Sequence, residues 1–185
     1  MLTAPDNAEE GVLSLLRSAN RSIAIQQMAI GGRQQPFVRA TLAAARRGIE
    51  VWVLLSSAWY IREDNGQLVR WLNERADVEG LPLEAKLAEP NGYEKIHAKG
   101  VIVDERHLVV GGSLNWNNHS ARENREVAVV LHGNQSGNYY TDVFEADWGE
   151  RDDRFPVGLG VVVTVGIAGA VWLAKKEMKF AQSSF

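Results

Sequence analysis

The sequence contains no cysteine among its 185 residues. Disulfide bonds, zinc sites built from thiolates and a cysteine nucleophile are therefore excluded. An excess of positive charge is also missing, because 20 basic residues face 23 acidic ones and the formal net charge is −3. A bulk electrostatic attraction to nucleic acid is not indicated, although this balance leaves room for a local basic groove.

The composition that is present is typical of a globular protein, with 45% apolar and 23% charged residues. The length predicts one domain, which we place at residues 1–150, followed by a short charged linker at 151–156. Hydrophobic periodicity predicts an alternation of helices and strands, then a cluster of strands and a last helix, which indicates an α/β fold with a mixed sheet. The expected helices cover residues 6–19, 36–47, 66–76 and 136–148, and the expected strands 22–30, 50–56, 83–87, 99–103, 107–110 and 126–131.

Residues 157–174 form an apolar run in which Thr164 is the only polar side chain. As a helix these residues would span about 27 Å, close to the bilayer core of about 30 Å. The basic side chains of Lys175, Lys176 and Lys179 follow at once, at the start of a short tail, 175–185. The run therefore predicts a single C-terminal transmembrane helix, and the alternative is a buried core helix.

The sequence His97-Ala98-Lys99-Gly100-Val101-Ile102-Val103-Asp104 is the richest in chemistry. In a strand-like segment, side chains two residues apart leave the same face, so the imidazole of His97 and the ammonium of Lys99 are expected together. A Gly111-Gly112-Ser113 turn follows, with the amide of Asn115 just beyond it. A nucleophile, a fixed cation and a set of hydrogen-bond donors suit attack on a phosphodiester without a metal.

The spacing His-x-Lys-x4-Asp, with a following Gly-Ser-x-Asn, resembles the signature of the phospholipase D superfamily. The resemblance implies an α/β sandwich in which helices flank a mixed sheet. It also implies that His97 attacks phosphorus and forms a phosphohistidine intermediate, while Lys99 clamps the phosphate oxygens. The same resemblance implies no metal ion and no other cofactor.

The resemblance assigns further roles around this pair. Ser113 and Asn115, with the backbone N–H groups of Gly111 and Gly112, would bind the phosphate oxygens, and Asp104 would be a structural acid. In the family the Gly-Ser pair begins after six residues beyond the Asp, whereas here six residues lead to Gly111-Gly112. Either Gly112 replaces the serine, or the turn is one residue longer.

A nucleophilic histidine needs a partner on its other ring nitrogen, which fixes the tautomer. The family supplies a carboxylate on the strand after the Gly-Ser turn. Glu126 is our first candidate for this residue, and Glu123 is the alternative because the register of the intervening segment is open. Both residues could also be solvated surface acids.

The family's active site is built from two such motifs, whereas this chain has one His-x-Lys-x4-Asp. The second motif would come from a homodimer mate or from a missing N-terminal half. The lysines after the apolar run favour a cytoplasmic tail and a catalytic domain outside the cytoplasm. Residues 1–6 lack the features of a signal peptide, so the chain resembles the C-terminal half of a larger exported protein. The alternative is a short, tail-anchored protein with a cytoplasmic domain.

The resulting hypothesis is a membrane-anchored phosphodiesterase of the phospholipase D type. Membrane anchoring and the acidic balance favour phospholipid headgroups as the substrate, in hydrolysis or phosphatidyl transfer. The alternatives are a metal-independent endonuclease acting as a homodimer and a non-catalytic scaffold domain at the membrane.

Overall fold

The computed structural model describes residues 1–89, 95–104 and 108–149. The expected linker, transmembrane helix and basic tail lie outside the described residues, so these predictions stay open. Within the described part, no helix combines the length and the apolar character needed to cross a membrane.

Seven strands form one mixed sheet, in the order β1-β7-β6-β5-β2-β3-β4. Strands β2, β3 and β4 are parallel, and every other pairing is antiparallel. The α/β fold with a mixed sheet, expected from the sequence, is confirmed. The strands are β1 (Leu2–Ala4), β2 (Ser22–Gln27), β3 (Glu50–Leu55), β4 (Leu83–Leu87), β5 (Lys99–Val103), β6 (Leu108–Gly112) and β7 (Glu126–His132).

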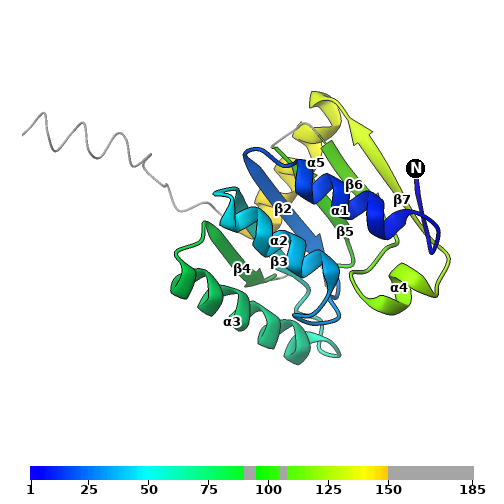
Figure 1. The fold of residues 1–185 in the computed structure, drawn as a ribbon. Coiled ribbons are helices and arrows are strands. Elements are labelled where there is room, and N and C mark those ends of the chain that lie inside the picture. Colours follow the sequence, from blue (N-terminus) through cyan, green and yellow to red (C-terminus); the bar gives the residue numbers. More distant parts are fainter. Residues whose placement is uncertain (90–94, 105–107, 150–185) are drawn as a thin grey trace, which may run out of the picture. The chain divides into compact units, whose positions relative to one another are not determined.

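Helices lie on both faces of this sheet. The helices are α1 (Ala8–Ser18), α2 (Pro36–Arg46), α3 (Arg62–Glu79), α4 (Asn118–Arg122) and α5 (Asn134–Trp148). Buried side chains of α1, α2 and α3 join the main core cluster, whereas Phe144 of α5 belongs to a separate small cluster with Leu54 and Ile102. Figure 1 shows α1 and α2 crossing one face of the sheet and α5 on the other.

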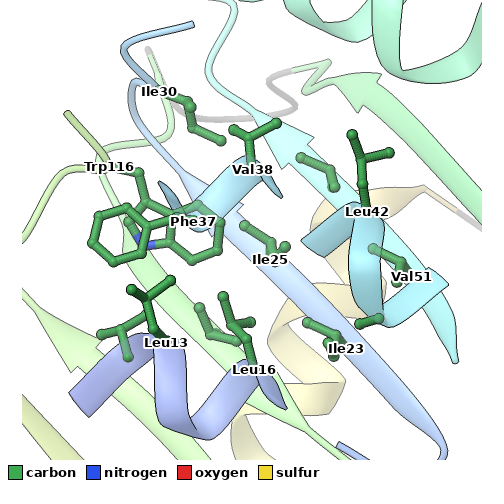
Figure 2. Close-up of a cluster of buried hydrophobic side chains, with 14 of the residues drawn as sticks. Leu13, Leu16, Ile23, Ile25, Ile30, Phe37, Val38, Leu42, Val51 and Trp116 are labelled. Carbon is green, nitrogen blue, oxygen red and sulfur yellow. The ribbon is translucent and has the colours of Figure 1, made fainter. Parts of the chain in front are cut away.

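Strand periodicity explains the main core. Ile23 and Ile25 on β2 and Val51 and Val53 on β3 alternate toward the same face, and each of these side chains is buried. The ring of Phe37 on α2 packs against Trp116 with the ring centroids 5.1 Å apart. Figure 2 shows this pair between α1, α2 and β2, so the core reaches the loop that follows β6.

Most boundaries differ from the sequence predictions by one or two residues, and one helix and two strands differ in ways that bear on the fold. The helix expected at 66–76 extends over Arg62–Glu79, and Gly80 ends it in the left-handed conformation that glycine permits. The strand expected at 22–30 ends at Gln27, and the strand expected at 107–110 extends to Gly112. Strand β1 and helix α4 were not predicted, because three and five residues are too few to show a periodicity.

One edge of the sheet collects most of the predicted site. Strands β2 and β3 end there at Gln27 and Leu55, and the antiparallel β5 begins there at Lys99. Because β6 and β7 are also antiparallel to their neighbours, β6 ends and β7 begins at the same edge. The topology therefore brings Lys99, Gly112 and Glu126 together.

Substituting Phe37→Ala should lower the free energy of unfolding by about 3–5 kcal/mol, because it removes a fully buried ring and leaves a cavity beside Trp116. Chemical denaturation of the full chain, followed by far-UV circular dichroism, measures this change. Val78→Ala on α3 is the control, because Val78 is 83% exposed and should change stability by less than about 0.5 kcal/mol. Equal effects of the two substitutions would contradict the core described here.

Candidate active site

His97 and Lys99 stand together at the start of β5. The strand begins at Lys99, so His97 belongs to the segment just before it and not to the strand itself. The two side chains still meet, since Lys99 Nζ lies 3.2 Å from His97 Nδ1 and donates to the His97 carbonyl oxygen at 2.8 Å. An ammonium has no lone pair, so Nδ1 accepts in this contact and the neutral ring carries its proton on Nε2.

The Lys99 side chain is partly buried, and its surroundings act on its pKa in opposite directions. Burial lowers the pKa of Lys99, and the negative charge of Glu126 partly offsets this, leaving the pKa below its ordinary value. Its third contact is the weak acceptor Met28 Sδ, 3.9 Å from Nζ. Lys99 therefore has few strong hydrogen-bond acceptors around its ammonium group.

Ser113 and Glu126 form the second part of the site. Ser113 Oγ donates to Glu126 Oε2 at 2.5 Å and accepts from the backbone N–H of Val127 at 3.2 Å. Asn124 Nδ2 donates to the other carboxylate oxygen at 3.2 Å. These bonds hold the carboxylate in one orientation, and the hydroxyl proton of Ser113 is already engaged in the hydrogen bond to Glu126.

The pKa of Glu126 reflects these contacts. The hydrogen bond from Ser113 lowers the pKa most, burial opposes it, and Asn124, Ser120 and the charge of Lys99 lower it further. The pKa is therefore below the ordinary glutamate value, and Glu126 is ionised near neutral pH. An ionised carboxylate can accept a hydrogen bond from an imidazole N–H, which is the role the sequence predicts for Glu126, and this role stays a prediction.

Gly112 has no room for a side chain. A Cβ at this position would meet the Val127 carbonyl oxygen at 2.1 Å and Ala128 Cα at 2.7 Å. A serine at position 112 would therefore clash with β7, whereas Ser113 reaches Glu126. Of the two alignments left open by the sequence, the longer turn with Ser113 as the motif serine fits this geometry.

Asp104 lies at the opposite end of β5 from Lys99. Its carboxylate accepts backbone N–H groups of Asn20 at 2.9 Å and Arg21 at 2.7 Å, and its own N–H donates to the Ser22 carbonyl oxygen at 2.8 Å. Burial raises the pKa of Asp104, but the backbone donors outweigh this and the pKa falls below its ordinary value. Asp104 thus ties β5 to the start of β2, in keeping with the structural role predicted for it.

Asn115 and Gly111 also lie at the site edge. Asn115 follows β6 directly beyond Ser113 and is half-buried, and its Oδ1 atom has no hydrogen-bond partner among the described residues. Gly111 is paired with Gly100 on β5, one residue from Lys99. Their roles in binding phosphate oxygens remain predictions.

Glu123, the alternative carboxylate, lies outside this group. It binds His119 Nδ1 at 2.9 Å on α4, and both side chains are exposed.

Asn124 and Met28 contact the site but were not predicted from the sequence, because no motif marks a residue that reaches a site only through the fold. Among the described residues, no group of three or more histidine, aspartate or glutamate side chains is arranged to hold a metal ion.

An aromatic rim borders the same edge. Trp59 and Tyr60 follow β3, 86% and 43% exposed, and their rings meet edge to face at 5.5 Å. Lys95 Nζ lies 5.4 Å from the centre of the Tyr60 ring, two residues before His97. The exposed aromatic pair therefore lies against a lysine that is close to His97 in the sequence.

A histidine, a lysine and a carboxylate on a mixed sheet suit phosphodiester chemistry, and comparison with known families gives the class of protein. The family model described as "Cardiolipin synthase, PLD-like domain" matches residues 12–148. The chain therefore belongs to the phospholipase D superfamily, as the sequence motif predicts. A comparison with curated proteins gives no match.

Several solved structures share the fold. NucT from Helicobacter pylori has 20% sequence identity and a TM-score of 0.65, covering 80% of this chain and 92% of its own. Nuc from Salmonella typhimurium, described as a phospholipase D family member, has 24% identity and a TM-score of 0.63 with the same coverage. Phosphatidylserine synthase from Haemophilus influenzae Rd KW20 has 16% identity and a TM-score of 0.61, covering 80% of this chain and 37% of its own.

Substituting Asp104→Asn should lower the free energy of unfolding by about 1–2 kcal/mol at pH 7, because the charged acceptor of the backbone N–H groups is lost. Asparagine tolerates the positive φ of 54° at this position, so the substitution tests the charge. The native pKa is depressed, so the stabilisation exists above the unfolded pKa and is lost as the pH falls through the native pKa.

The difference between wild type and Asp104→Asn should therefore shrink below about pH 4, as measured by urea denaturation across pH. Asp77→Asn, on the exposed surface of α3, is the matched control. A difference that stays constant down to pH 2 would show that the carboxylate charge does not carry the effect.

Proposed function

We propose that this domain is a metal-independent phosphodiesterase that cleaves phospholipid headgroups through a phosphohistidine at His97. The observation that carries the proposal is the contact of His97 with Lys99, beside the ionised and hydrogen-bonded Glu126. An imidazole, a cation and an oriented carboxylate are the groups that nucleophilic attack on a phosphodiester needs.

The first step requires a rearrangement of the contacts seen here. Lys99 moves from His97 Nδ1 onto the phosphate oxygens, and the ring changes tautomer: water takes the proton from Nε2 and returns one to Nδ1, which then donates to Glu126. The lone pair of Nε2 then attacks phosphorus, the N–P bond forms and the bond from phosphorus to the leaving oxygen breaks. Lys99 balances the charge that gathers on the other phosphate oxygens. Water or an alcohol displaces the imidazole in the second step.

The leaving oxygen needs a proton, which a second motif would supply. The face of the sheet that carries α5 suits a partner domain: Val127, Val129 and Tyr140 are exposed there. A groove of about 470 Å³ beside them reaches Ala98 and Gly111 of the motif region. We propose that the domain bearing the second motif, either a second copy or an N-terminal half, covers this face.

The substrate class rests on the surroundings of the site. Trp59 and Tyr60 are exposed at the rim beside Lys95, and aromatic rings with a lysine suit the lipid–water interface. The apolar run 157–174 and the net charge of −3 favour the same surface over a polyanion. We also propose that this run anchors the chain in a membrane, with the catalytic domain outside the cytoplasm.

A nuclease is the second candidate, favoured by one observation. The chain covers 92% of the length of NucT and of Nuc, but 37% of phosphatidylserine synthase. Binding to a nucleic acid would weaken steeply with salt, because cations released from phosphates drive it. Cleavage of single-stranded DNA with such a salt dependence, and none of phospholipid vesicles, would replace the lipid proposal.

Purified full-length chain in mild detergent should hydrolyse bis-p-nitrophenyl phosphate, and His97→Ala should reduce turnover on the order of a thousandfold or more, because the nucleophile is removed. Activity should persist in EDTA. Release of p-nitrophenolate measures both, and light scattering gives the oligomeric state. Exposed His119→Ala is the control for removal of an imidazole.

Each result has one interpretation. Turnover by a dimer, lost in His97→Ala, places the second motif on a second copy. An inactive monomer assigns the second motif to another domain. Activity that His97→Ala leaves intact, or that EDTA abolishes and added metal restores, would overturn the mechanism.

Trp59→Ala should lower turnover of phospholipid vesicles severalfold and leave hydrolysis of the soluble bis-p-nitrophenyl phosphate unchanged, because the ring contacts the lipid surface and not the phosphorus. Headgroup release from anionic vesicles is measured beside the soluble assay. Tyr139→Ala on α5 is the matched control, an exposed aromatic residue away from the rim. A loss that is equal on both substrates would show that Trp59 serves the site itself or the fold.

A further inference from the structure

Gln27, the last residue of β2, is a buried polar residue directly beside the site. Its side chain is 1% exposed, and it stands opposite Lys99 in the antiparallel pairing of β2 with β5. Directly opposed residues project from the same face of a sheet, with Cβ atoms about 5 Å apart. The amide of Gln27 therefore lies beneath the stem of the lysine.

The side-chain oxygen of Gln27 is unpaired within the described residues. Its Oε1 atom is buried and has no hydrogen-bond partner there. Gln27, Lys99 and Trp116 line a small space of about 10 Å³, roughly the room that the centre of one water molecule needs. The other residues that line this space are apolar side chains and Gly100. A buried acceptor without a partner destabilises a fold, so we expect a water molecule in this space to donate to it.

The Lys99 ammonium can donate a hydrogen bond to such a water molecule. Its Nζ is shared among the His97 carbonyl oxygen, His97 Nδ1 and Met28 Sδ, and thioether sulfur is a weak acceptor. Attack by His97 Nε2 needs Nδ1 free of the lysine. A stronger acceptor next to Met28 would draw the ammonium away from the ring, and Gln27 is the adjacent residue on β2.

We propose that Gln27 is a positioning residue: its Oε1 accepts a hydrogen bond from the Lys99 ammonium through one water molecule held in this space, which draws the ammonium away from His97 Nδ1. Gln27 does not touch the substrate. It sets where the cation rests, and so leaves Nδ1 to Glu126. The role in turnover rests on the proposed function, whereas the contact with Lys99 does not.

The contact has a signature that needs no turnover. The titratable groups that face Lys99 from the described elements are His97, before β5, and Glu126, on β7. Neither changes in Gln27→Met, which keeps the length of the side chain but removes the acceptor. Loss of an acceptor from the charged form lowers the pKa of Lys99, and the carboxylate of Gln27→Glu raises it.

The first experiment measures the pKa of Lys99 by NMR, from the pH dependence of its ¹³Cε shift in the full chain with labelled lysine. The signal is assigned through Lys99→Arg. We expect a pKa about one pH unit lower in Gln27→Met and a higher value in Gln27→Glu. An unchanged pKa in both variants would overturn the proposal, whether or not the wild type shows phosphodiesterase activity.

The second experiment compares stability with kinetics. Gln27→Met should leave stability nearly unchanged, because the buried acceptor and the water molecule it binds are lost together, and yet lower kcat about tenfold with little change in KM. Thr141→Val on α5 is the matched control, since the Thr141 hydroxyl is also buried and unpaired within the described residues. Thr141→Val should be at least as stable as the wild type and keep its kcat.

The outcomes separate the two proposals. A wild type without turnover ends the proposed function, and the NMR titration still decides on Gln27. A Gln27→Met variant with unchanged kcat, in an active enzyme, would show that Gln27 is a structural residue of the core. A variant that fails to fold, with Gln27→Glu folded and its Lys99 pKa unchanged, would also overturn the proposal.

Discussion

The register between β2 and β5 is the constraint on which the rest of the site depends. The pairing places Gln27 opposite Lys99 and Ile23 opposite Val103, so the lysine shares a face with the main core. A slip of one residue would turn Lys99 to the face that carries α5. The carboxylate of Asp104 holds the backbone at Asn20 and Arg21 and thereby fixes this register at the far end of the strand.

The electrostatics of the site follow from that placement. Burial withdraws water from Lys99 and weakens its hold on the proton, while Glu126, fixed by Ser113 and Asn124, restores part of that hold. Cation and carboxylate thus hold each other in their charged forms at a half-buried position. In the proposed reaction the carboxylate is already oriented before substrate binds, so the rearrangement is confined to the Lys99 ammonium and the ring of His97.

Much of this arrangement could be predicted from the sequence. The motif around His97 and Lys99, the structural place of Asp104 and the strand that starts at Glu126 all follow from local spacing and strand periodicity. The partner of Ser113 could not be predicted, because it depends on how β6 pairs with β7. Ser113 and Glu126 are thirteen positions apart in the sequence. The lack of room for a side chain at Gly112 has the same origin, because the backbone of β7 lies against this position. The burial of Gln27 was missed because a glutamine at a strand end gives no hydrophobic signal.

The position of Asp104 explains what the motif spacing measures. Asp104 lies five positions after Lys99, about 17 Å away at strand geometry, so the two ends of the signature cannot touch one phosphate. The interval between them corresponds to the length of β5, from one end of the strand to the other. The spacing of the motif therefore reflects the length of a strand that has the Lys99 cation at one end and the structural carboxylate of Asp104 at the other. A chain that changed this interval would keep every reactive group and still misplace the cation.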